Sequence, residues 1–190
     1  MYSSCIFCCY ETAAVPVHVV TSPPIGQSAQ QNVVSELTKA NAIVDRLIQT
    51  SPNIIHLMRR LRENISAQQR TVLENQFLDE LQGSLYQGGV PPGMVPGFAQ
   101  LLSHNTVREI YMVSAEHGAD IMVYFLCKTV QSLYSLGQMI VSGFMHAVFA
   151  VAIESLARTT VDVYVRRDEY NLRLLCLSSP DDKGSSVDRG

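Results

Sequence analysis

The side chains that most often do chemistry are few and scattered in this sequence. Five histidines and five cysteines form no pair at the spacing of a metal site, and neither a phosphate loop nor a nucleophile motif accompanies them. The neighbouring acids Asp168 and Glu169 do not face each other on a helix or turn, so we do not expect a paired acid–base role. The sequence therefore predicts a protein that is not an enzyme and holds no metal and no cofactor.

His146 is the histidine that lies in the most apolar stretch of the chain, from Met139 to Ile153. A histidine in such surroundings is more often a core residue with its hydrogen bonds satisfied, or part of a pocket wall, than a metal ligand. We therefore expect His146 to be buried or to line a pocket.

The cysteines indicate a reducing compartment. Their odd count makes a poor disulfide framework, and Cys127 and Cys176 lie in apolar runs that predict buried thiols. Cys5, Cys8 and Cys9 lie close to the N-terminus, where they are either acylated or part of a plain flexible start. We expect an intracellular location, in the nucleus or the cytoplasm, with membrane association as the alternative.

The composition predicts a chain with a large core and little affinity for nucleic acid. Of 190 residues, 47% are hydrophobic and 16% are charged, so the chain can bury a core of its own. The net charge is −3, and the densest basic run, Arg59 to Arg62, is typical of a solvated helix face. We expect no direct contact with nucleic acid.

The order of patterns along the chain predicts an all-α fold, as a layered helical sandwich or bundle with disordered tails. Apolar residues at helical spacing begin after Ser28, and Ser66 is typical of a helix N-cap, with Gln69 in the third place of an imperfect capping box. A second long helix is expected from Val107 through Gly118 to Phe125. The expected parts are a flexible tail at 1–27, amphipathic helices at 28–82, a Gly/Pro loop at 83–97, an apolar helical core at 98–182 and a tail at 183–190.

Two short segments allow a strand as an alternative to this helical interpretation. Val15 to Val20 is a candidate strand within the N-terminal tail. Thr159 to Val165 is rich in β-branched residues and predicts either a short strand or the start of a helix.

Thr129 to Ile153 contains no charged residue, so it is either the centre of a globular core or a lipid-facing helix. Polar residues and Gly137 and Gly143 interrupt it, which favours the core.

Three segments, in order, resemble the ligand-binding domain of nuclear receptors. Ile65 to Leu73, with its paired glutamines, is similar to the start of that domain's first helix. Val107 to Leu136 resembles the third helix and its exit, and Glu169 to Gly184 resembles the region of the eighth and ninth helices.

The resemblance implies a divergent or truncated receptor domain that acts in transcription regulation. It implies a small apolar ligand, in a pocket with contacts at Ala115, Ala119 and Met122 and with His146 nearby, and a coregulator peptide held by Lys128. In the family, this lysine bonds the terminal carbonyls of the coregulator helix, since helix C-termini attract cations. The alternative is a helical interaction or scaffold protein with a helical partner, associated with a membrane through residues 129–153.

Overall fold

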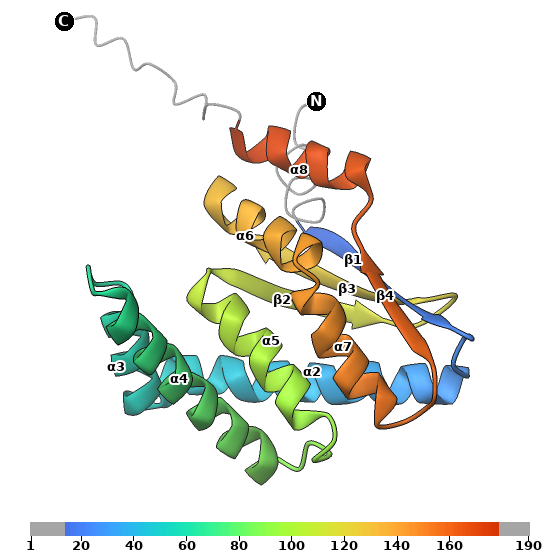
Figure 1. Ribbon diagram of the computed structural model, residues 1–190, viewed down its shortest axis with the longest axis horizontal. Coiled ribbons are helices and arrows are strands. Elements are labelled where there is room, and N and C mark those ends of the chain that lie inside the picture. The colour runs from blue at the N-terminus through green and yellow to red at the C-terminus, as the bar shows by residue number, and fades with distance from the viewer. Residues whose placement is uncertain (1–13, 179–190) are drawn as a thin grey trace, which may run out of the picture.

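The computed structural model describes residues 14–178, and over this range the chain forms seven helices and one four-stranded antiparallel sheet (Figure 1). The prediction of an all-α fold is therefore wrong, although most of the expected helices are present. Cys5, Cys8 and Cys9 and the predicted C-terminal tail lie outside the described residues. The elements in chain order are β1 (Ala14–Ser22), α2 (Gln27–Thr50), α3 (Pro52–Leu61), α4 (Ala67–Gln87), α5 (Val95–Val107), β2 (Ile110–Glu116), β3 (Ile121–Cys127), α6 (Val130–Val141), α7 (Phe144–Glu154), β4 (Thr160–Tyr164) and α8 (Arg167–Ser178).

The three helices predicted in the front part of the chain are confirmed. The apolar stripe of α2 is buried through Val33, Leu37 and Val44. Helix α4 starts at a complete capping box, because Ser66 accepts from the backbone N–H of Gln69 at 3.2 Å and the Gln69 side chain accepts from the N–H of Ser66 at 3.2 Å. The predicted Gly/Pro loop is shorter than expected, since α4 continues to Gln87 and α5 begins at Val95.

The helix predicted from Val107 to Phe125 is instead the end of α5 followed by the hairpin of β2 and β3. Burial in β3 alternates strictly from Ile121 to Cys127, which is the period of a strand with one face in the core. The run is apolar throughout, so its composition fits a helical or a strand period equally well. Gly118 lies in the turn between the strands, where an added Cβ would meet nothing within 4 Å, and not in a closely packed helix.

The sheet has the order β2-β3-β1-β4, so its inner strand β1 comes from the segment predicted as a flexible tail. The candidate strands at Val15–Val20 and Thr159–Val165 are both confirmed, as β1 and β4. Two strands far apart in the sequence pair antiparallel, with Val19 opposite Val163. Because of this pairing, segments near the two ends of the described chain lie side by side in the sheet.

One face of the sheet is covered by α2, α5 and α7, and α8 packs on the other (Figure 1). Val17 and its alternate neighbours are buried on the covered face. On the opposite face, the His18 ring stacks on Tyr164 with centroids 4.8 Å apart, and its Nε2 lies 3.7 Å from Oε2 of Glu169 on α8. Helix α8 has no buried residue, and its Leu172 is exposed. Cys176 is exposed on the same helix, so its predicted burial is wrong, whereas Cys127 is buried as expected.

The uncharged run is two core helices, α6 and α7, separated at Gly143, which has a left-handed φ of 80°. Leu133, Leu136 and Phe149 are fully buried within the protein. Among the described residues, none of the helices is by itself long and apolar enough to cross a membrane. Helices α6 and α7 taken together pass that test by length and composition, with a bend of 59° between them.

Helix α5 is the central helix and lies between α4 and α7 (Figure 1). Gly97 lets α5 approach α7 closely, since a Cβ at this position would lie 2.7 Å from the carbonyl oxygen of Val148. The helix ends at Val107, and Glu109 then turns the chain into β2 with a φ of 57°, a conformation that side chains other than glycine rarely adopt. Both features help to determine which side of α5 faces solvent.

Replacing Gly97 with alanine should lower the free energy of unfolding by about 1–3 kcal/mol, because the backbone of α7 must move to admit the methyl group. Gly83 is the matched control, since it lies within α4 with no atom within 4 Å of an added Cβ. Gly83→Ala should raise the free energy of unfolding by about 0.5–1 kcal/mol through helix propensity. Urea denaturation measures both, and equal effects of the two substitutions would contradict the close packing of α5 on α7.

Candidate functional site

A hollow with both polar and apolar lining residues lies among α4, α5, α6 and α7, and we call it the His104 trough. It consists of two cavities, of about 180 and 530 Å³, that share His104, Arg108 and Phe144 as lining residues. The first is also lined from α4 and α5 by Glu74, Asn75, Leu78, Gln100, Ser103 and Val107. The second is also lined from α6 and the residue that follows it by Gln131, Tyr134, Ser135, Gln138, Met139 and Ser142.

The wall between the two cavities is a stack of two rings. The His104 ring lies against the ring of Phe144, with centroids 4.4 Å apart and an angle of 30° between the planes. Helix α5 presents His104 because its other sides are buried, and Phe144 is placed at the start of α7 by the left-handed Gly143. The two rings give the trough a flat surface within a lining that also contains apolar side chains such as Leu78 and Met139.

His104 is held in its neutral form. Burial and, to a smaller extent, the nearby charge of Arg108 lower the pKa of His104 to about 4. A neutral imidazole has one nitrogen that donates and one that accepts a hydrogen bond. At neutral pH the ring therefore contributes polarity to the trough without adding charge.

Arg108 is the cation of the trough. Its Nη1 donates to the carbonyl oxygen of His104 at 3.2 Å, and among the described residues no carboxylate lies within 4 Å of it. Burial lowers the pKa of Arg108, Glu74 opposes that effect, and Arg70 adds to it. An arginine stays protonated under these conditions. The trough therefore holds a half-buried positive charge with no ion-pair partner in the described protein.

Four side-chain amides, each a double donor and an acceptor, also line the trough. Within the part of the chain that the structure describes, none of the four makes a hydrogen bond to the protein. All four are exposed and come from three helices around the two cavities, so their hydrogen-bonding groups are available to a bound molecule. These residues are Asn75, Gln100, Gln131 and Gln138.

The trough has polar groups but no activated nucleophile among the described residues. The hydroxyl of Ser135 donates to the carbonyl oxygen of Gln131 at 3.0 Å and that of Ser142 to the carbonyl oxygen of Met139 at 3.4 Å, so neither donates to a base. The buried thiol of Cys127 lies outside the trough, and burial raises its pKa to about 12, so it stays protonated and inert. The described residues also contain no group of three or more His, Cys, Asp or Glu side chains arranged to hold a metal ion.

The residues predicted from the sequence as ligand contacts do not come together. Ala115 and Met122 lie on the strands of the β2–β3 hairpin, and Ala119 lies in its turn. Ala119 borders a cavity of about 10 Å³, which is the size of one water molecule. His146 is exposed on α7, so the expectation that it is buried is wrong.

Lys128, the residue expected to hold a coregulator helix, lies between β3 and α6 and is exposed. It follows a strand and not a helix. Its Nζ lies 5.0 Å from the centroid of the Tyr111 ring, which is a cation–π contact. None of the five predicted site residues lines the His104 trough.

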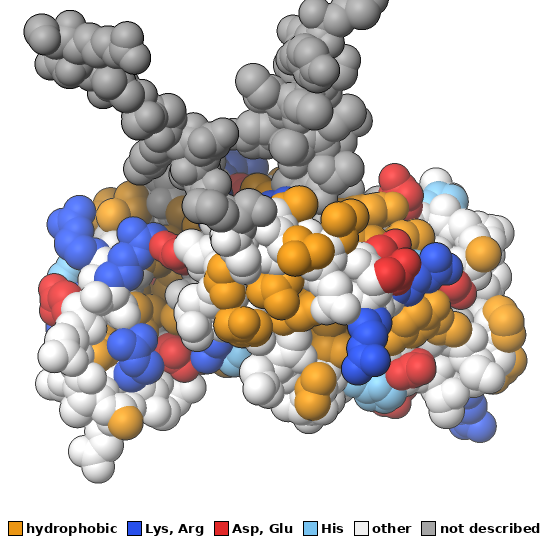
Figure 2. Space-filling view, turned by 90° about the horizontal axis from the view of Figure 1, so that it is seen from above, with side chains coloured by type: hydrophobic (Ala, Val, Ile, Leu, Met, Phe, Trp, Pro, Cys, Tyr) orange, Lys and Arg blue, Asp and Glu red, His pale blue; other side chains and the backbone are white. Residues whose placement is uncertain are grey.

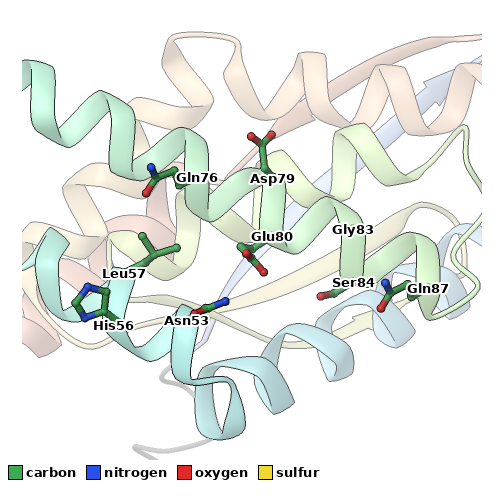
Figure 3. A pocket seen from close by; sticks show the side chains of 9 residues that line it. All are labelled: Asn53, His56, Leu57, Gln76, Asp79, Glu80, Gly83, Ser84 and Gln87. Carbon is green, nitrogen blue, oxygen red and sulfur yellow. The ribbon is translucent and has the colours of Figure 1, made fainter.

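A second hollow is an open furrow between α3 and α4 (Figure 3). His56, Asp79 and Glu80 are exposed there, and Asp79 points away from His56 and Asn53. The furrow is about 660 Å³ in volume, but its polar side chains do not converge on one point. We therefore assign it no chemistry.

The trough is not among the sites predicted from the sequence, although polar residues at helical spacing indicate parts of its lining. Gln100, His104 and Arg108 are spaced by four residues, which places them on one face of α5 and its C-cap, while most other residues of the helix are apolar. Gln131, Ser135, Gln138 and Ser142 follow the same helical spacing in the uncharged run. The sequence alone does not show that these two polar stripes face the same hollow.

The carbon signal of the His104 ring should titrate with a midpoint near pH 4 in an NMR experiment, far below the ordinary value of about 6.5. The unfolded chain binds this proton near pH 6.5 and the folded chain only near pH 4. The contribution of His104 to the free energy of unfolding is therefore fully present above pH 6.5, and it is lost as the pH falls from 6.5 to 4.

The His104→Gln variant is the control for this linkage. It should lose less stability than the parent between pH 6.5 and 4, because every other titrating group is shared by the two proteins. A midpoint near 6.5 would contradict the burial of this ring against Phe144.

No family model, no curated protein and no solved structure matches the chain. The three segments that resemble a receptor domain lie at the start of α4, across α5, β2, β3 and α6, and in α8 with the residues after it. The all-α architecture that this resemblance implies differs from the mixed fold of the described residues. We therefore infer the function from the geometry of the trough.

Proposed function

We propose that this protein is a non-enzymatic interaction domain that binds an extended peptide segment of a partner protein in the His104 trough. The observation that carries the proposal is that four exposed side-chain amides, none bonded to the described protein, line the two cavities that share the His104–Phe144 stack.

The chemistry of the lining matches that of a peptide main chain. An extended peptide presents N–H and C=O groups at regular intervals, and a glutamine or asparagine amide can pair with both. The ring stack offers an apolar surface for one side chain, as recognition sites commonly combine apolar surface with a few fixed polar groups. The lining comes from four helices of the folded core, so the trough is formed before a partner arrives.

The small apolar ligand implied by the receptor resemblance has less support. Drug-sized ligands occupy pockets of about 300–1,000 Å³ that are largely apolar. The space beside Ala119 is about 10 Å³, so the predicted contact residues do not enclose a site for such a ligand. The trough combines amides and hydroxyls with apolar side chains such as Met139, a mixture that suits a peptide with both polar main-chain groups and apolar side chains.

Selection from a random nonapeptide library displayed on phage tests this function. Peptides enriched on the intact chain should bind in solution and shift the side-chain amide NMR signals of Gln131 and Gln138. The double substitution Gln131→Ala and Gln138→Ala should weaken binding about 5- to 150-fold, because each amide contributes roughly 0.5–1.5 kcal/mol through its hydrogen bonds.

Two control variants keep this test specific. Val141 is 84% exposed on α6 outside the trough, so Val141→Ala should leave the affinity unchanged. Lys128→Ala should also leave it unchanged, and a loss with that variant would favour the coregulator site of the receptor resemblance. Failure to enrich any peptide, or enriched peptides that shift signals outside the trough, would refute the proposal.

A further inference from the structure

Arg108 places a positive charge in the His104 trough and forms no ion pair with a carboxylate among the described residues. Nearby Arg62 has a carboxylate at 4.0 Å, from Glu109, and Arg70 donates to the carbonyl oxygen of Leu61 at 3.1 Å. Arg108 has only the carbonyl oxygen of His104 at 3.2 Å among the described residues, and its side chain is partly buried. Glu74 acts on Arg108 electrostatically but forms no ion pair with it among the described residues, so the guanidinium can still accept a carboxylate in direct contact.

We propose that the trough is specific for peptides that carry a carboxylate, which pairs with the guanidinium of Arg108; this inference rests on the proposed peptide-binding function. The planar guanidinium presents parallel N–H groups that match the two oxygens of a carboxylate. Partial burial strengthens the attraction, since the effective dielectric constant is lower there than in water.

The position of Arg108 relates the carboxylate to the rest of the peptide. Arg108, His104 and Phe144 border both cavities of the trough, so the charge lies at the middle of the lining and not at its outer rim. Peptide residues on both sides of the carboxylate can then reach the amides of Gln100 and Gln138. His104 stays neutral beside it, so the pairing does not depend on a second cation.

Charge around the trough favours a single negative charge over a phosphate. Glu74 lines the same cavity as Arg108 and would repel a dianion more strongly than a monoanion. The whole chain has a net charge of −3, which opposes binding of a polyanion such as nucleic acid. Basic side chains are visible on the side of α3 and α4 (Figures 1 and 2), but Arg60 there is already paired with Glu63 at 3.9 Å. One carboxylate is therefore the charge that this site accommodates.

Fluorescence polarisation with an enriched nonapeptide from the phage selection provides the test. Enriched peptides should share an aspartate, a glutamate or a free C-terminal carboxylate. Changing that acid to its amide should weaken binding about tenfold or more, because hydrogen bonds to charged groups contribute more than neutral ones. Amidating the C-terminus separates a terminal carboxylate from a side-chain carboxylate.

The protein side of the same test uses Arg108→Gln and Arg108→Lys. Arg108→Gln should weaken the acidic peptide about tenfold and should leave the affinity of the amide-substituted peptide unchanged, which identifies the two groups as partners. Arg108→Lys should keep part of the affinity, since the charge remains but the forked geometry is lost. Arg60→Gln is the matched control and should have no effect. The peptide substitution leaves the protein intact, so the test does not depend on the folding of a variant.

The outcomes separate this inference from the proposed function. Enriched peptides that bind in the trough but share no acid, or that bind Arg108→Gln as well as the parent, would refute the carboxylate pairing and leave peptide binding standing. Tighter binding after phosphorylation of a peptide serine placed at the acid's position would also refute it. If no peptide is enriched, both proposals fall.

Discussion

The packing of α5 between α4, α7 and the sheet is the constraint on which the rest of the structure depends. Phe98, Leu101 and Leu102 bury nearly all sides of this helix, and Gly97 brings its backbone close to that of α7. Burial of these side chains provides much of the hydrophobic free energy that joins the helices to the sheet. A helix buried in this way has one narrow face left for polar residues. Gln100, His104 and Arg108 occupy that face, and they are the residues that form one side of the trough.

The polar face of α5 would be an ordinary helix surface without α6 and α7. The break at Gly143 turns the uncharged run back on itself, so the glutamine and serine stripe of α6 faces the same hollow as Arg108. The same turn places Phe144 against His104, and the resulting burial lowers the histidine pKa. The geometry of the trough and its charge state therefore both follow from how the apolar helices pack.

The sequence predicts parts of this structure well and others poorly, for identifiable physical reasons. Helices α2 to α4 are amphipathic, and their periodicity and the Ser66 cap are local signals, so the sequence indicates helices in this part of the chain. The β2–β3 hairpin was predicted as a helix because a run such as Ile121 to Cys127 is apolar at every position and has no informative period. The candidate site could not be found from the sequence because His104 and Gln138 belong to different elements, brought together only by long-range packing. Lys128 and His146 were placed by resemblance and by apolar context, and neither of these determines which way a side chain faces.

A crystal structure of the chain with a peptide enriched from the library tests the account most directly. We expect the peptide main chain to lie along the His104 trough and to form hydrogen bonds with the amides of Gln131 and Gln138. A peptide carboxylate should pair with the guanidinium of Arg108. A peptide bound instead on the α8 side of the sheet, in the furrow between α3 and α4, or beside Lys128 would contradict it.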